Sequence, residues 1–204
     1  EKIHLLKGSG MGSAFGSNPK GVPGAAGTIV PTPRLGLPEV YFADGPAGLR
    51  LISKREGDDK RYYNTAFPIG SLLASTWNTE LVKNVGVSIG SEAKSYGVDL
   101  VLGPGVNLHR HPLCGRNFEY YSEDPFLTGH IGAAMINGIE SEGIGASPKH
   151  FAVNNQETSR NWNDAIVSER ALRELYLKSF EIIVKESQPW AIMTSYNKIN
   201  GTYA

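Results

Sequence analysis

The chain has 204 residues, with 20 basic and 20 acidic side chains, so its formal net charge is zero. This balance argues against nucleic acid or an anionic membrane as the main partner, because both attract basic surfaces. Hydrophobic residues make up 40% of the chain and charged residues 20%, which is typical of a globular domain and excludes a disordered chain.

Features of secreted or membrane-bound proteins are scarce. The single cysteine, Cys114, excludes an internal disulfide framework and leaves the compartment open. No apolar run reaches the roughly 18 residues that span a bilayer, and the N-terminus does not have the pattern of a signal peptide. We therefore expect a soluble protein, either cytoplasmic or, in a bacterium, periplasmic or secreted.

The N-terminal part predicts little regular structure. Ile3, Leu5, Leu6 and Gly8 have the pattern of the end of a helix, and the chain stops at Ala204 soon after an apolar stretch, so we expect both ends to be cut. Residues 8 to 36 are rich in Gly and Pro and predict a long irregular segment. Such segments are uncommon in compact domains unless they are functional.

The first strand is predicted at residues 40 to 43, ending at Asp44-Gly45-Pro46. Residues 53 to 63 are highly charged and predict a solvated surface loop. Residues 67 to 77 are apolar and predict a second strand.

A helix is predicted next, with Asn78 or Thr79 as its cap. Apolar residues then recur at helical spacing: Val82, Val85, Ile89, Ala93 and Tyr96. Gly86 and Gly90 within this segment predict a close approach to a neighbouring element. Gly97 is expected to end the helix in a left-handed conformation.

Two further helices and two strands follow. Residues 99 to 102 predict a strand, and residues 106 to 123 a loop. Asp124-Pro125 predicts a helix start, because a carboxylate caps the helix and proline suits its first turn. Ser168 is the predicted cap of a third helix, and residues 191 to 196 predict a last strand. Apolar residues mark the buried faces of the two helices: Ile131, Met135 and Ile139, then Leu172, Leu175, Tyr176, Phe180 and Ile183.

The most informative stretch is residues 144 to 152, which predict a short buried strand ending on Lys149 and His150. Polar residues 154 to 160 follow at once. In α/β folds ligands bind at the carboxyl ends of parallel strands. Adjacent residues of an ideal strand point to opposite faces, so both side chains reach one ligand only where the backbone is irregular. A cis peptide bond not preceding proline is one such irregularity.

The alternation of strands and helices predicts right-handed βαβ units and a parallel sheet. Polar residues at the ends of several strands favour a closed barrel over an open sheet. We therefore predict an α/β fold, a partial TIM-type (β/α) barrel with about five of the eight βα units of a whole barrel. Residues 1–204 would then form one incomplete domain with uncovered strand edges and apolar helix faces.

Several of these polar residues are candidates for ligand binding. Asp44 can accept two hydrogen bonds from vicinal hydroxyls, although Asp before Gly is also common in turns. The planar donor fork of Arg116 suits hydroxyls or a carboxylate. Glu119 is expected to pair either with Arg116 or with Lys149. Arg160 follows in the polar stretch, and Met193 and Tyr196 close the last strand.

The predicted loop over residues 106 to 123 also contains possible metal ligands. His109 and His111 form a His-x-His pair of the kind that binds zinc, with Cys114 nearby. A barrel hydrolase that depends on a metal is thus one alternative. No other ligand spacing supports it, so we predict neither a metal nor a cofactor.

Six stretches carry a more specific pattern and lie in order along nearly the whole chain: Pro33-Arg-Leu-Gly-Leu-Pro38, Ala43-Asp-Gly-Pro-Ala-Gly-Leu-Arg50, Gly103-Pro-Gly-Val-Asn-Leu-His109, Gly115-Arg-Asn-Phe-Glu-Tyr-Tyr-Ser-Glu-Asp-Pro125, Lys149-His-Phe-Ala-Val-Asn-Asn-Gln-Glu157 and Met193-Thr-Ser-Tyr-Asn-Lys-Ile-Asn-Gly201. Together they resemble the N-terminal barrel domain of glycoside hydrolase family 3, in its β-glucosidase branch. Members of the family's N-acetylglucosaminidase branch are expected to have a loop histidine after Phe151, where this chain has Ala152-Val153-Asn154-Asn155, so we set that branch aside.

The resemblance implies a retaining, exo-acting β-glycosidase that hydrolyses terminal β-D-glucosyl residues and binds one sugar at the barrel mouth. The partner would be a small carbohydrate, with no cofactor. By the family pattern the sugar hydroxyls are held by Asp44, Arg116, Lys149, His150 and Tyr196. Arg50, Arg160 and Met193 would support these residues.

The resemblance also implies what the chain lacks. The nucleophilic Asp is expected beyond Ala204 and the acid/base Glu in a second domain, so the chain would carry pocket residues without the catalytic pair. We expect neither Glu119 nor Glu157 to complete a pair with Asp44. The isolated chain is therefore predicted to be inactive, and a non-catalytic sugar-binding module is the alternative. The uncovered faces leave two expectations open, self-association or an excerpt from a longer polypeptide.

Overall fold

The computed structural model describes residues 3, 6, 8 and 21–204. The predictions of a helix end near the N-terminus and of an irregular segment over residues 8 to 36 rest largely on Leu5 and residues 9 to 20. These residues lie outside the described ones. Among the described residues, no helix is both long and apolar enough to cross a membrane.

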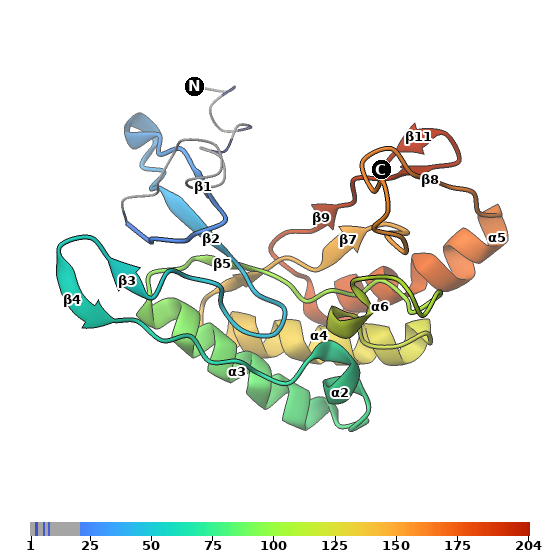
Figure 1. Ribbon diagram of the computed structural model, residues 1–204, viewed down its shortest axis with the longest axis horizontal. Helices are drawn as coiled ribbons and strands as arrows, with labels where there is room; N and C mark the ends of the chain where they lie inside the picture. The colour runs from blue at the N-terminus through green and yellow to red at the C-terminus, as the bar shows by residue number, and fades with distance from the viewer. Residues whose placement is uncertain (1–2, 4–5, 7, 9–20) are drawn as a thin grey trace.

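A layer of short strands forms the centre of the fold (Figure 1). One sheet has the order β1-β2-β5-β6, in which β2, β5 and β6 pair in parallel and β1 is antiparallel to β2. Its strands are β1 (Gly27–Ile29), β2 (Val40–Asp44), β5 (Leu100–Leu102) and β6 (Gly145–Ala146). Strands β7 (Lys149–Phe151) and β9 (Met193–Thr194) form a second parallel pair. A parallel bridge between Gly105 and Lys149 links the segment after β5 to β7.

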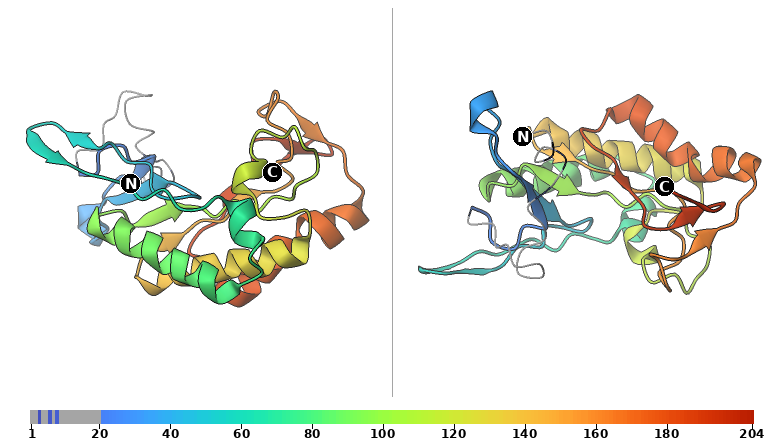
Figure 2. Two further views of the ribbon diagram at one scale, coloured as in Figure 1. Left: turned by 60° about the horizontal axis from the view of Figure 1, so that its bottom comes forward. Right: turned by 90° about the horizontal axis from the view of Figure 1, so that it is seen from above.

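Helices cover one face of this strand layer (Figures 1 and 2). The long ones are α3 (Thr79–Ser95), α4 (Pro125–Ser141) and α6 (Lys178–Ser187), and α4 packs between the other two. The shorter helical segments are η2 (Pro33–Leu35), α2 (Gly70–Ala74), η3 (Asn117–Glu119), α5 (Glu169–Ala171) and the π-helical η4 (Leu172–Tyr176). Parallel strands alternating with helices on one face confirm the predicted partial (β/α) barrel.

The predicted helix ends are confirmed by their capping geometry. The side chains of Asn78, Asp124 and Ser168 each accept a hydrogen bond from a backbone N–H two or three residues further on, at 2.9, 2.9 and 3.2 Å. Gly97 and Gly143 follow the ends of α3 and α4 with φ of 75° and 78°. This left-handed conformation is the one that glycine adopts at low cost.

Helices α3 and α4 approach each other through glycines. A Cβ atom at Gly86 would lie 2.4 Å from the carbonyl oxygen of Met135, and one at Gly138 would lie 2.1 Å from that of Lys83. At Gly90 it would lie 2.7 Å from the carbonyl oxygen of Ile139. These distances confirm the close approach predicted for Gly86 and Gly90.

The hydrophobic core lies between the strand layer and the helices. Its fully buried side chains come from both layers and include Ala43, Val82, Ile89, Val101, Ile131, Met135, Ile139, Phe180 and Ile183. Burying one such large apolar side chain contributes about 1.5–3 kcal/mol. Leu172 and Tyr176, which were predicted to face inward, are half-buried and pack against this core. Leu175, in the same π-helical segment, is also half-buried.

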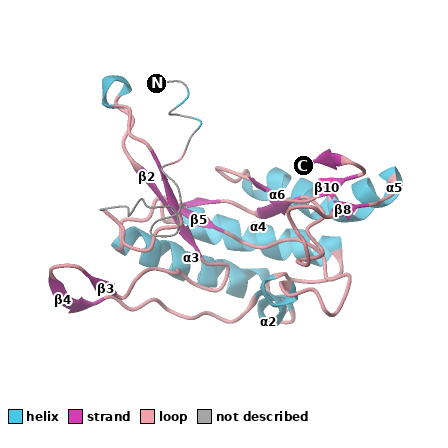
Figure 3. Ribbon diagram, turned by 45° about the horizontal axis from the view of Figure 1, so that its top comes forward, coloured by secondary structure: helices cyan, strands magenta, loops and turns pink. Residues whose placement is uncertain are grey.

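Two predictions between β2 and α3 are wrong. Residues 67 to 77 contain the helix α2 rather than a strand; a short apolar run cannot by itself distinguish a strand from a buried helix. Residues 53 to 63 form a hairpin of β3 (Lys54–Arg55) and β4 (Asp58–Arg61) rather than a loop. Figure 3 shows this hairpin projecting from the body of the molecule. Gly57 turns it with φ of 76°, and the guanidinium of Arg55 lies 3.9 Å from the ring centre of Tyr62.

The strand predicted over residues 144 to 152 is divided into β6 and β7, which belong to different sheets. The peptide bonds Lys149–His150 and Phe151–Ala152 are cis. The strand predicted at residues 191 to 196 is limited to β9. A small sheet of order β11-β10-β8 was not predicted, because its two-residue strands have no readable periodicity. Its strands are β8 (Asp164–Ala165), β10 (Lys198–Ile199) and β11 (Thr202–Tyr203).

Candidate functional site

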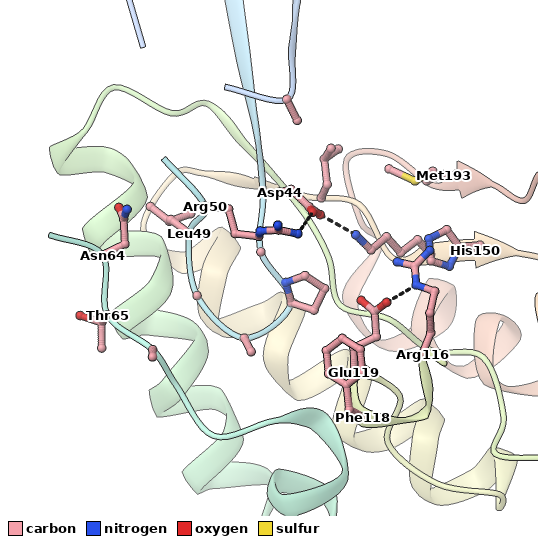
Figure 4. Close-up of a pocket in the computed structure, with 18 of the residues that line it drawn as sticks. Asp44, Leu49, Arg50, Asn64, Thr65, Arg116, Phe118, Glu119, His150 and Met193 are labelled. Carbon is pink, nitrogen blue, oxygen red and sulfur yellow. Dashed lines mark hydrogen bonds and ion pairs between the residues drawn. The ribbon is translucent and has the colours of Figure 1, made fainter. Parts of the chain in front are cut away.

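A hollow of about 720 Å³ lies where β2, β5, β7 and β9 meet the loops that follow them. Figure 4 shows side chains from these separate elements turned toward one another. All the residues predicted from the sequence to bind the ligand line this hollow: Asp44, Arg50, Arg116, Lys149, His150, Arg160, Met193 and Tyr196. The fold therefore brings together side chains that are spread over more than 150 positions of the sequence.

Asp44, at the end of β2, holds two cations. Its Oδ1 accepts a hydrogen bond from Nζ of Lys149 at 2.8 Å, and its Oδ2 accepts one from Arg50 at 3.3 Å (Figure 4). Burial alone would raise the pKa of Asp44, but the charge and hydrogen bond of Lys149, with Arg50 and Arg116, outweigh burial and lower it. Asp44 is therefore an ionised acceptor at neutral pH.

Arg116 is fixed by Glu119, which lies one turn further along in η3. The Nε atom of Arg116 donates to Oε1 of Glu119, whose side chain is only 5% exposed. Burial would lower the pKa of Arg116, but the hydrogen bond and charge of Glu119 raise it instead. Of the two partners predicted for Glu119, the structure selects Arg116 over Lys149. The rest of the Arg116 fork makes no hydrogen bond within the part of the chain that the structure describes.

His150 is buried at the floor of the hollow, with 3% of its surface exposed. Burial, followed by the positive charges of Arg116, Lys149 and Arg160, lowers its pKa from 6.5 to about 2. The imidazole is therefore neutral over the physiological range. Lys149 and His150 are adjacent in β7, yet both line the same hollow.

Another side of the hollow is lined by Arg160, from the loop after β7, and by Met193 and Tyr196, in and just after β9. Arg160 donates to Oε2 of Glu157 at 3.1 Å, and its guanidinium lies 4.9 Å from the ring centre of Tyr196. Tyr196 is 54% exposed, so its ring presents a face at the edge of the hollow. Met193 lies in β9, and its backbone N–H donates to the carbonyl oxygen of Pro148 at 3.1 Å.

Sequence reasoning missed the buried polar residues around His150. Asn107, Tyr120 and Asn154 are each at most 4% exposed and form hydrogen bonds with or near His150. None of them has a spacing that would identify a site. Asn107 and Tyr120 appeared only within the stretches of the family resemblance, and Asn154 appeared there and among the polar residues after β7 without a role. Phe118 also lines the hollow and remains half-exposed.

His109 and His111 hold a loop together. The Nε2 atom of His109 lies 2.8 Å from the carbonyl oxygen of Asn117 and 3.0 Å from that of Tyr120, so this nitrogen carries the hydrogen. Nδ1 of His111 accepts from the backbone N–H of Leu113 at 3.1 Å. Within residues 3, 6, 8 and 21–204, no three His, Cys, Asp or Glu side chains gather closely enough to share a metal ion.

Comparison with known proteins gives consistent matches. The family model described as "Glycosyl hydrolase family 3 N terminal domain" matches residues 42–204. The chain is 49% identical over 178 residues to thermostable β-glucosidase B of Acetivibrio thermocellus, covering 85% of this chain and 23% of the relative. It is 50% identical over 173 residues to an exo-α-(1→6)-L-arabinopyranosidase of Bifidobacterium longum, covering 83% of this chain and 23% of the relative.

A solved structure also matches nearly the whole chain. The structure of β-glucosidase 3B from Thermotoga neapolitana in complex with glucose has a TM-score of 0.96 and 54% sequence identity, and the match covers 99% of this chain and 28% of that chain. The chain spans about a fifth to a quarter of the length of the curated relatives that it matches.

Proposed function

Because the chain belongs to glycosyl hydrolase family 3, we propose that it supplies the sugar-binding part of the active site of a retaining, exo-acting β-glycosidase. The substrate would be a terminal β-D-glucosyl residue, bound as a single pyranose in the hollow beside Asp44. The observation that carries this proposal is that all the predicted ligand-binding residues line one hollow.

The chemistry of the lining suits a neutral polyol. Asp44 offers carboxylate oxygens as acceptors, whereas Arg116, Lys149 and Arg160 offer only donors. A pyranose hydroxyl both donates and accepts, so a ring of hydroxyls matches a lining that offers donors as well as acceptors. In a site shielded from water, each such hydrogen bond left unmade costs about 1–3 kcal/mol, which disfavours ligands without hydroxyls.

We further propose that residues 1–204 alone bind the sugar without cleaving it. Retaining hydrolysis needs two carboxyl groups about 5 Å apart, one as nucleophile and one as acid and base. Among the described residues, the two carboxylates that line the hollow are paired with cations, Asp44 with Lys149 and Arg50, and Glu119 with Arg116. Glu157, in the loop after β7, is paired with Arg160. The catalytic pair would then come from other parts of the whole protein.

An assay with an aryl β-D-glucoside tests both statements. The full-length protein should release the aryl alcohol, with retention at the anomeric carbon, and residues 1–204 should not. Turnover by residues 1–204 that is abolished in Asp44→Asn or Glu119→Gln would refute the second proposal. A full-length protein that binds glucose but cleaves no glycoside would favour a sugar-binding module instead.

A further inference from the structure

Asn107 is a buried side chain outside the set of predicted ligand-binding residues. Its Oδ1 accepts a hydrogen bond from the backbone N–H of His150 at 2.8 Å, and its Nδ2 donates to the backbone carbonyl of His150 at 3.0 Å. A backbone N–H can only donate and a carbonyl can only accept. The backbone N–H and carbonyl of His150 therefore fix which side of the Asn107 amide carries the oxygen and which carries the nitrogen.

This orientation decides what faces the imidazole. Oδ1 of Asn107 also lies 3.3 Å from Nδ1 of His150. An amide oxygen has lone pairs and no hydrogen, so it can form a hydrogen bond with Nδ1 only if Nδ1 carries the hydrogen. Asn107 thus favours the tautomer of His150 that is protonated at Nδ1.

Tyr120 favours the same tautomer of His150. Its hydroxyl has one hydrogen, which it donates to the backbone carbonyl of Asn154 at 3.2 Å. Nδ2 of Asn154 donates to Oε1 of Glu157 at 3.0 Å and to the Tyr120 oxygen at 3.2 Å. The Tyr120 oxygen, 3.4 Å from Nδ1 of His150, is then available there only as an acceptor.

We propose that Asn107 is a positioning residue that, together with Tyr120, holds His150 as the Nδ1–H tautomer, so that Nε2 is a bare acceptor facing the hollow. Within the described residues, Nε2 has no hydrogen-bond partner, while Nδ1 has two. Neutral histidine has one donor and one acceptor nitrogen, and the bond made by one nitrogen sets the role of the other.

The consequence concerns ligand recognition and rests on the proposed function. Lys149, Arg116 and Arg160 around the ring can only donate, so ligand oxygens accept from them. Nε2 adds an acceptor on this side of the hollow and takes the hydrogen of one ligand hydroxyl. Burial and the same cations lower the pKa of His150 to about 2, so protonation does not remove this acceptor at neutral pH. The site therefore requires a hydroxyl that donates at this position, and not merely an oxygen.

The tautomer can be measured without any sugar. In protein labelled with ¹⁵N in its histidine rings, a protonated and a bare ring nitrogen give separate signals, and His150→Gln identifies the signals of His150 among the five histidines. We expect a protonated Nδ1 and a bare Nε2. A protonated Nε2, or an even mixture of the two tautomers, would overturn the proposal.

Variants distinguish an effect of Asn107 on the His150 tautomer from an effect on the stability of the fold. Asn107→Ala should shift His150 toward the Nε2–H tautomer, whereas Tyr120→Phe, which keeps Asn107, should retain mainly Nδ1–H. Asn197→Ala is the matched control, because Asn197 is fully buried but donates only to the carbonyls of Ala152 and Lys198. A tautomer unchanged in folded Asn107→Ala, or changed equally in Asn197→Ala, would contradict the role of Asn107. If Asn107→Ala does not fold, the unmodified protein still decides the tautomer.

Glucose analogues test the consequence for the ligand. Fluorine in place of a hydroxyl can accept weakly but cannot donate. At one ring position we expect the deoxyfluoro and the deoxy sugars to bind equally weakly, about tenfold more weakly than glucose, and glucose should shift the Nε2 signal. Glucose binding with an unchanged Nε2 signal would contradict the acceptor role. A complete lack of glucose binding would refute the proposed function, while the tautomer measurement would stand separately.

Discussion

Nζ of Lys149 lies 2.8 Å from Oδ1 of Asp44, although the two residues are 105 positions apart in the sequence. This ion pair joins the end of β2 to the start of β7 across the hollow. Only 4% of the Lys149 side chain is exposed, compared with 34% of the Asp44 side chain. The pair therefore gives a nearly buried side chain a partner of opposite charge at the point where the ligand is proposed to bind.

Removing the carboxylate should destabilise the fold as well as the site. Asp44→Ala leaves the Lys149 ammonium buried without its partner, and breaking a fully buried pair costs roughly 3–5 kcal/mol. Because Asp44 is partly exposed, we expect a smaller loss, about 1–3 kcal/mol in the free energy of unfolding, measured in urea at pH 7. The double variant Asp44→Ala/Lys149→Met should be less destabilised than Asp44→Ala alone. Equal stability of Asp44→Ala and the unmodified protein would contradict this account.

Stability should fall as the pH falls below about 6.5, through His150. Its pKa is lowered from 6.5 to about 2 on folding, so between these values the unfolded chain binds a proton that the folded chain does not. The stabilisation is complete above pH 6.5 and is lost progressively toward pH 2, by at most about 1.4 kcal/mol per pH unit. The lowered pKa of Asp44 adds a loss of the same sign below its ordinary value of 3.8.

Urea unfolding at pH 6.5, 5.5 and 4.5 measures this slope, and His150→Gln provides the control. Its slope should be shallower than that of the unmodified protein, because only His150 differs between the two. Identical slopes would show that His150 does not change its pKa on folding.

The glycine contact between α3 and α4 should tolerate no side chain. Gly138→Ala would place its Cβ 2.1 Å from the carbonyl oxygen of Lys83, so the two helices must separate. We expect a loss of about 1–3 kcal/mol in thermal or urea unfolding, despite the better helix propensity of alanine. Ser91→Ala, on the exposed face of α3, should change stability by less than about 0.5 kcal/mol. A Gly138→Ala variant more stable than the parent would disprove the close approach.

Even the conservative substitution Arg116→Lys should weaken glucose binding. Lysine keeps the charge but loses the planar fork, of which one nitrogen is held by Glu119 in a side chain that lines the hollow. Calorimetry should show glucose binding about tenfold weaker for Arg116→Lys, equivalent to about 1.4 kcal/mol. Arg170→Lys, at a site 84% exposed on α5, should leave the affinity unchanged. Equal affinities for the two variants would exclude Arg116 from the proposed sugar contacts.

Features encoded over a few neighbouring residues were predictable. The caps at Asn78, Asp124 and Ser168 each depend on one side chain and the N–H groups just after it, so the sequence alone indicates them. The candidates at strand ends, Asp44, Lys149, His150 and Tyr196, were also accessible, because polar residues placed directly after apolar strands converge in a parallel α/β fold. Their shared hollow follows from this topology. The supporting roles of Arg50, Arg160 and Met193 came from the family resemblance.

Features set by distant partners were not predictable. The helix α2 depends on Ser71, whose hydroxyl donates to the carbonyls of Asn117 and Tyr120, and on the backbone of Glu119 packed against Gly70. Likewise, the amide of Asn107 meets His150 43 positions away. Neither relationship leaves a periodicity or a local spacing that could be read from the chain.

The claim that the hollow holds one pyranose is tested most directly by a crystal structure of the protein with glucose. We predict one glucose in the hollow, with hydroxyls within hydrogen-bonding distance of Asp44, Lys149 and Nε2 of His150. A hollow filled only by water at saturating glucose, or a sugar bound at another surface while Asp44 and Lys149 keep only each other, would contradict the account.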